Sequence, residues 1–240
     1  MYALVQHEVV WASEAELNWT AADRAMSAAQ DADTPAALAG AAWTLGMVQR
    51  SGGDTDGALT LAAEAAGLLE PRLEEAGDEL RGMYGALQLH AATTAARAGR
   101  EGDAWRHWDT ASTIAERLAD HYHHPWTMFG RSNVKLHAVS IAADLSRSAE
   151  ARNRAEDIDP EEIPSRERRG RLGVEIARSY CQRRDYPAML HWLEQAYQTS
   201  ADSVRYSPTA RQMAADAVDH GGALISRRAR SLAGSVGLPL

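Results

Sequence analysis

The residues best suited to recognise a ligand lie in the stretch from Trp126 to His137. If this stretch is helical, Asn133 and His137 are one turn apart and share a face with Phe129. The stripe would present an aromatic ring, an amide and an imidazole, which together could recognise a ligand in a groove. The alternative is that Asn133 and His137 only hydrogen-bond to neighbouring backbone or to a carboxylate.

Two further places could line the same groove. Arg178 and Tyr180 could form a second wall, where the guanidinium would hold a carboxylate through a bidentate pair. Such arginines are also often solvated or paired with acids, and Glu175 is near enough in sequence to serve. Trp43 falls between the packing positions of its expected helix, so it could point into the groove or into the core.

Three histidines, His121, His123 and His124, suggest a metal site at first sight. The spacing argues against zinc, because His123 and His124 are adjacent and would point apart on a helix. No cysteine accompanies them, and no His-Glu-x-x-His pattern occurs in the chain. Pro125 indicates a helix end, where histidine can satisfy terminal carbonyls. We therefore expect no metal here.

The sequence contains no recognisable catalytic constellation. There is no Gly-x-Ser-x-Gly elbow, phosphate-binding loop or dinucleotide fingerprint. Cys181 is the only cysteine, and its position within an expected helix indicates a buried packing residue. We therefore expect no enzymatic activity and no cofactor.

The elements that would position these residues are predicted to be helices. Alanine dominates the apolar residues, and Phe129 is the only phenylalanine. Alanine favours helix, whereas strands need β-branched and aromatic residues in alternation, which are missing here. An all-α fold follows.

Charge and hydropathy limit the partners. The formal net charge is -8, and a domain that binds nucleic acid by itself is usually basic, so we expect no direct nucleic-acid binding. No apolar run is long enough to cross a membrane, and the first residues do not resemble a signal peptide. These features predict a cytoplasmic protein without a membrane partner.

Small residues recur with a spacing typical of tetratricopeptide (TPR) hairpins. In such a unit, a small residue on the first helix precedes a small residue on the second by twelve positions, where the two helices cross. Three pairs follow this spacing: Gly46 with Ala58, Ala92 with Ala104, and Ala177 with Met189. In the first unit, Asp54 or Thr55 is the expected N-cap of the second helix.

The remaining segments complete a predicted repeat domain. Residues 2–15 and 20–32 would form one hairpin, and residues 126–144 and 149–157 a degenerate one. Residues 209–232 would form a single C-terminal capping helix. We thus predict one domain over 1–240, a TPR-like right-handed solenoid of about five antiparallel hairpins, with a concave groove lined by the first helix of each hairpin.

One stretch also resembles a known family. The string Trp126-x-x-Phe129-Gly130-x-x-Asn133-Val134-x-x-His137, with Ala155-x-x-Ile158-Asp159 and Pro164 after it, resembles the C-terminal TPR-like region of actinobacterial Xre/Cro-type transcriptional regulators. The resemblance implies an effector-sensing or dimerisation domain that controls a DNA-binding head. We recognise no helix-turn-helix here, so the chain is either a fragment or a stand-alone relative.

Two functions are therefore expected as alternatives. The first is a sensor domain that binds a peptide or small-molecule effector in the groove. The second is an adaptor that binds a partner protein without any link to DNA. Homodimerisation through the C-terminal helix is a further expectation. The predicted contact residues are Asn133, His137, Phe129, Trp126, Trp43, Arg178 and Tyr180.

Overall fold

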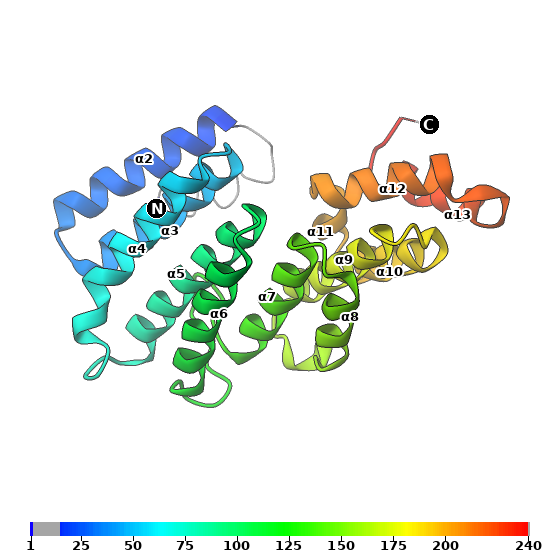
Figure 1. Cartoon of the computed structure of the whole chain (residues 1–240). Helices are drawn as coiled ribbons and strands as arrows, with labels where there is room; N and C mark the ends of the chain where they lie inside the picture. The colour runs from blue at the N-terminus through cyan, green and yellow to red at the C-terminus, as the bar shows by residue number, and fades with distance from the viewer. Residues whose placement is uncertain (2–14, 240) are drawn as a thin grey trace. The chain divides into compact units, whose positions relative to one another are not determined.

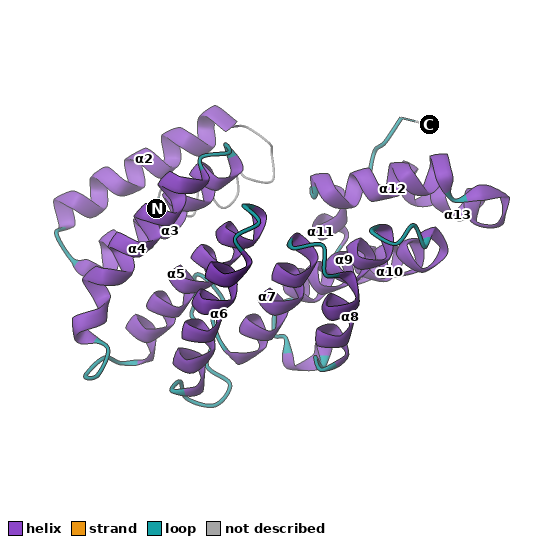
Figure 2. Ribbon diagram, in the orientation of Figure 1, coloured by secondary structure: helices purple, strands orange, loops and turns teal. Residues whose placement is uncertain are grey.

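The computed structural model describes residues 1 and 15–239, and over this part of the chain all regular structure is helical (Figures 1 and 2). The predicted all-α class is confirmed. The predicted helix at residues 2–15 lies almost wholly outside the described residues. The α-helices are α2 (Ala15–Ala32), α3 (Pro35–Ser51), α4 (Thr55–Leu69), α5 (Asp78–Arg97), α6 (Glu101–Glu116), α7 (Arg131–Asp144), α8 (Ser148–Glu156), α9 (Arg166–Cys181), α10 (Tyr186–Thr199), α11 (Ala201–Arg205), α12 (Pro208–His220) and α13 (Gly222–Ser235).

Many of these helices begin at a side-chain cap. Asp54 accepts a hydrogen bond from the N–H of Gly57 at 2.9 Å, and Asp185 caps α10 in the same way. A cap of this kind satisfies one of the backbone donors that the first helical turn leaves without a partner. Thr34, Ser165 and Ser207 cap α3, α9 and α12.

The same turn joins α3 to α4, α5 to α6, α7 to α8, and α9 to α10. In each turn one residue has a positive φ, and the next N–H donates to the carbonyl five residues back, as in Asp54 to Gln49 at 2.9 Å. This 6→1 bond is the mark of a Schellman-type helix end. The positive-φ residues are Gly53, Gly99, Ser146 and Arg184.

The hairpins predicted from the twelve-residue spacing are present as packed helix pairs. Helix α3 packs on α4, α5 on α6 and α9 on α10. Figure 1 shows α3 beside α4, and α5 beside α6. We call α3, α5, α7 and α9 the first helices of their hairpins. A right-handed solenoid built from these hairpins stays a prediction.

The chain forms two compact units, Met1–His137 and Ala138–Leu240, so the division falls inside α7. In the first unit, α5 packs against α3, α4 and α6, and most of its residues from Gly82 to Ala96 are buried. In the second unit, α9 and α10 pack with α12 around Met189, Leu190 and Leu193.

The structure corrects the predicted start of the helix that carries Asn133. We expected this helix from about Trp126, but α7 begins at Arg131. The preceding segment is a closed loop in which Met128 has a φ of 58°. His124 N–H donates to Phe129 O, and Met128 N–H donates to His124 O, both at 2.9 Å. The second bond closes a single turn, but the first bond runs opposite to the helical direction and Met128 has a left-handed φ, so the turn does not continue as a helix.

The C-terminal helix is also corrected. We expected one helix over 209–232, but the segment breaks into α12 and α13 at Gly221 and Gly222. Gly222 has a φ of 72°, a conformation that ends a right-handed helix. The two helices pack on each other and on α10.

Candidate functional site

Asn133 and His137 lie one turn apart on α7, as predicted. Asn133 is 7% exposed, and its Oδ1 has no hydrogen-bond partner among the described residues. His137 is half-buried, and its Nδ1 donates to the carbonyl of Asn133 at 2.8 Å. The imidazole therefore makes the local backbone bond that we gave as the alternative. The amide oxygen of Asn133 is a buried acceptor that a ligand could satisfy.

Phe129 and Trp126 precede the helix, so they do not continue the stripe. Phe129 is 0% exposed, and its ring fills the space above Gly85 of α5. A Cβ atom on Gly85 would lie 2.0 Å from that ring. Phe129 therefore packs the interior and offers no surface to a ligand, in contrast to our prediction. Trp126 is 43% exposed and can still contact a partner.

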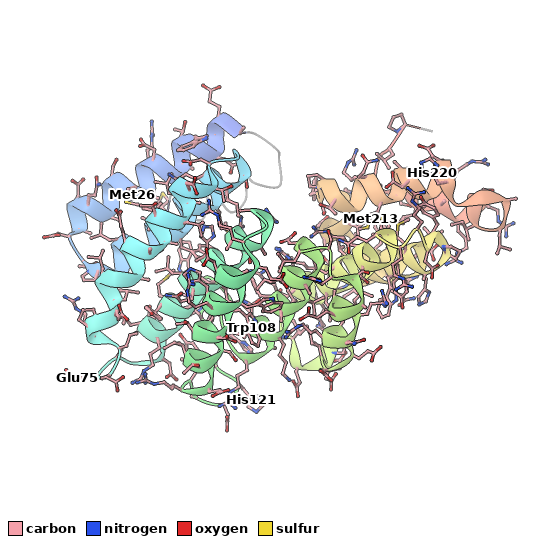
Figure 3. All side chains as sticks on the ribbon, viewed as in Figure 1. Met26, Glu75, Trp108, His121, Met213 and His220 are labelled. Carbon is pink, nitrogen blue, oxygen red and sulfur yellow. The ribbon has the colours of Figure 1, made fainter. Side chains whose placement is uncertain are left out.

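The histidine segment works as a structural loop. The Nδ1 of His124 accepts the N–H groups of Trp126 and Thr127, each at 3.3 Å. His124 thus serves backbone donors of its own loop, where we had expected a histidine to serve terminal carbonyls. Burial lowers the pKa of His124, which keeps the ring neutral and able to accept. His121 of this loop is labelled in Figure 3. Within residues 15–239, no three His, Cys, Asp or Glu side chains are grouped to hold a metal ion.

His90 on α5 is a polar core residue that our sequence analysis missed. It is 4% exposed, and Arg50 of α3 donates from Nη1 to its Nδ1 at 3.3 Å. Its Nε2 lies against Gly46, where a Cβ would be 2.8 Å away. In the part of the chain that the structure describes, Nε2 has no hydrogen-bond partner.

The environment of His90 favours the neutral ring. Burial, and then the positive charges of Arg50, Arg97 and His137, hold the pKa of His90 well below its usual value. The neutral ring accepts from Arg50 at Nδ1, so its proton is on Nε2. The sequence carried one signal of this residue, a lone histidine in the alanine-rich stretch from Leu89 to Ala96.

Arg178 and Tyr180 belong to the second unit, where neighbours engage both. Arg178 forms ion pairs with Asp144 at 2.7 Å and with Glu175 at 3.5 Å. The guanidinium of Arg152 lies 5.3 Å from the centre of the Tyr180 ring. The pairing of Arg178 with Glu175 is the alternative that we gave from the sequence.

The tryptophans on paired helices are packing residues in large part. Trp43 is half-buried against the core of the first unit. Trp108, labelled in Figure 3, packs on the same core, and its indole N–H donates to the Val134 carbonyl at 2.9 Å. This bond fastens α6 to α7, and with it the stripe that carries Asn133. Trp192 packs on the core of the second unit.

Cys181 lies half-buried at the end of α9, with its Sγ 3.9 Å from Asp216 Oδ2. Burial, and then the charge of Asp216, raise the pKa of the thiol. A thiol with a raised pKa is a poor nucleophile at neutral pH.

Comparison with known proteins gives no assignment. The sequence matches no protein-family model. No curated protein is similar enough to it to count as a match. Among the described residues, no helix is long and apolar enough to cross a membrane.

Proposed function

We propose that the chain is a TPR-like sensor domain of a bacterial transcriptional regulator of the Xre/Cro type. In this proposal a peptide or small-molecule effector binds the first unit on the first helices α3, α5 and α7. The observation that carries it is a pair of buried polar atoms, His90 Nε2 and Asn133 Oδ1, that lack partners among the described residues. A buried polar atom without a hydrogen-bond partner lowers the stability of the fold. A bound ligand could supply the missing partners.

The repeated hairpin turn supports the TPR-like part of the proposal. A turn with the same hydrogen bonds recurs at Gly53, Gly99, Ser146 and Arg184. Stacked units of one supersecondary structure are the basis of solenoids, whose first helices line a concave binding face. The regulator assignment rests on the resemblance of the stretch from Trp126 to His137.

The proposed mechanism is a population shift. The effector would prefer one arrangement of the hairpins over another, and the difference in its affinity would bias the domain toward that arrangement. Trp108 would couple the ligand site to α6, because its indole is bonded to the backbone of α7.

An adaptor function is the second candidate, and exposed apolar side chains favour it. Leu224 at the start of α13 is 89% exposed, and Trp19 and Trp126 also reach solvent. A partner protein could cover such side chains, and a second copy of the chain could cover Leu224. A homodimer through the C-terminal helices stays a prediction.

The test is thermal unfolding of the whole chain with fractions of a cell extract and with peptide pools. A ligand that binds only the folded state at 100 times its dissociation constant adds about 2.7 kcal/mol. We expect an upward shift that Asn133→Ala and His137→Ala abolish. Arg106→Gln is the control, because Arg106 is exposed on α6 and, among the described residues, pairs with Asp103 one turn before it.

The adaptor function predicts a different outcome of the same experiment. If no fraction of small molecules or peptides shifts the unfolding, but a protein is retained in a stable complex, the adaptor function replaces the sensor. Trp126→Ala should then weaken that complex more than Asn133→Ala does.

A further inference from the structure

The segment between α6 and α7 is closed by hydrogen bonds that require an unprotonated histidine. We call residues 119–130 the histidine loop. The Nδ1 atom of His124 accepts the N–H groups of Trp126 and Thr127, each at 3.3 Å. A ring nitrogen that accepts cannot also carry a proton. Protonation at Nδ1 would therefore break both bonds and place a third N–H donor against the other two.

His124 also connects the histidine loop to α5. Its ring lies on Gly82, where a Cβ would be 3.1 Å from Cδ2, and the Phe129 ring lies on Gly85. Gly82 and Gly85 are three residues apart, so they lie on the same face of α5. The N–H of His124 donates to the carbonyl of Phe129 at 2.9 Å. Because the two residues share a helix face and a main-chain bond, a displacement of His124 also displaces Phe129.

The closed conformation of the histidine loop is strained. His121 and Met128 have φ values of 61° and 58°, a left-handed conformation that is unfavourable for residues with a Cβ. Strain of this kind persists only where the surrounding bonds enforce it. The loss of the two bonds to His124 Nδ1 therefore removes part of what holds the loop closed.

The charges near His124 leave its ring neutral at neutral pH. Burial lowers the pKa of His124, and the charge of Glu79 on α5 opposes this effect without reversing it. Burial and then His121 lower the pKa of His123, and burial raises the pKa of Tyr122, so both are also neutral. Three ion pairs border the loop: Asp78 with Arg81, Asp120 with Arg131, and Glu74 with Arg117.

We propose that His124 is a proton-sensitive latch, whose protonation opens the histidine loop and withdraws the Phe129 ring from α5. The ring takes up one proton from water at Nδ1, and the two bonds that it accepts are lost. Since burial lowers the pKa of His124, the closed loop is favoured above pH 6.5 and loses stability as the pH falls below that value. The latch does not depend on the ligand site proposed above.

The experiment is hydrogen exchange of the whole chain, read by mass spectrometry at pH 7.5, 6.5, 5.5 and 5.0. Protection factors, which are corrected for the intrinsic effect of pH on exchange, are compared for residues 119–130 and for α3 and α4. We expect protection of the histidine loop to fall below pH 6.5, approaching about tenfold per pH unit, the slope for one proton. Protection of α3 and α4 should fall less.

Matched variants identify the titrating group. In His124→Asn, the side-chain oxygen takes the place of Nδ1 as acceptor but does not titrate, so protection of the loop should no longer depend on pH in this range. His121→Asn makes the same substitution at an exposed histidine of the same loop and should behave as the parent does. His90→Gln removes the other buried histidine and should keep the local transition.

Three results would overturn the latch. One is a loop transition in His124→Asn that equals that of the parent. Another is an equal loss of protection in the loop, α3 and α4, which would mean that acid unfolds the first unit as a whole. The third comes from nitrogen NMR of the parent at pH 7.5, which needs no variant: we expect the proton of the His124 ring on Nε2, and a proton on Nδ1 would contradict the proposal.

Discussion

The two units both place an arginine on a first helix, but they surround it differently. In the second unit, Arg178 lies between Asp144 and Glu175, and all three charges are compensated within the unit. In the first unit, Arg50 lies beside a neutral histidine, and Arg97 and His137 add positive charge. Arg178 thus pairs with carboxylates, whereas Arg50 donates to a ring nitrogen that can accept only while His90 stays neutral.

The units also differ in how they make the same turn. The first unit uses Gly53 and Gly99 at the left-handed position, and the second uses Ser146 and Arg184 with φ values near 60°. Glycine adopts this conformation without a steric penalty, while a residue with a Cβ pays about 1–2 kcal/mol. At these hairpin turns, the second unit therefore carries local strain that the first unit avoids.

The largest expected effect concerns the buried ring of Phe129 in the first unit. Phe129→Ala should lower the free energy of unfolding by about 3–5 kcal/mol, because the ring is fully buried against Gly85 and its loss leaves a cavity. Urea unfolding followed by tryptophan fluorescence measures it. Trp126→Ala in the same loop is the control and should cost less than about 1 kcal/mol. Equal effects would mean that the loop does not pack as described.

The next effect tests the compensated arginine. Arg178→Ala should cost about 2–3 kcal/mol, at or below the usual range for breaking a buried pair, because Arg178 is partly exposed while Asp144 is buried. Arg97→Gln in the first unit should change the stability by less than about 0.5 kcal/mol, because Arg97 is exposed. If Arg97→Gln were as costly as Arg178→Ala, the contrast between the units would fail.

The acid sensitivity of the first unit comes third. The pKa of His90 is lowered in the folded state. Below pH 6.5, His90 therefore binds a proton in the unfolded chain but not in the folded chain. Stability should therefore fall as the pH drops from 6.5, by up to about 1.4 kcal/mol per pH unit from this residue. Urea unfolding at pH 7.5, 6.5 and 5.5 measures the slope. His90→Gln should make the slope shallower, while the contribution of His124 remains, and an unchanged slope would contradict the assignment.

The smallest effect concerns the turns. Gly53→Ala and Gly99→Ala should each destabilise by about 1 kcal/mol, and Arg184→Gly should stabilise by less than about 1 kcal/mol because the flexible unfolded chain offsets part of the gain. Arg184 is exposed, so its side chain has little packing to lose. Melting temperatures of the three variants test this. If the alanine variants were more stable than the parent, or Arg184→Gly less stable, side-chain contacts would determine the stability of these turns.

The hairpins were predictable because their signals are local and periodic. Gly46 and Ala58 stand twelve residues apart, and Gly53 lies in the turn between them, so spacing and turn chemistry agree. The helix start at Arg131 was missed because the preceding loop is held by a hydrogen bond from His124 N–H to Phe129 O, which no periodicity reveals. The break at Gly221 and Gly222 had a visible signal, the glycine pair itself.

The candidate site was predictable only in part. Asn133 and His137 were found because their spacing places them on one helical face. His90 was missed because its role depends on the hydrogen bond from Arg50, which is 40 residues earlier in the chain. Phe129 was given a ligand role because no sequence pattern shows that Gly85 leaves a space for its ring.

The contact between Gly46 and His90 has an evolutionary consequence. Since a methyl group on residue 46 would lie 2.8 Å from His90 Nε2, residue 46 cannot gain a Cβ unless the His90 ring shifts. Gly46→Ala should be tolerated far better in a chain that also carries His90→Ser, so each change acts as a suppressor of the other. Related chains that lose the histidine are thereby released to replace the glycine, and the two positions are expected to vary together.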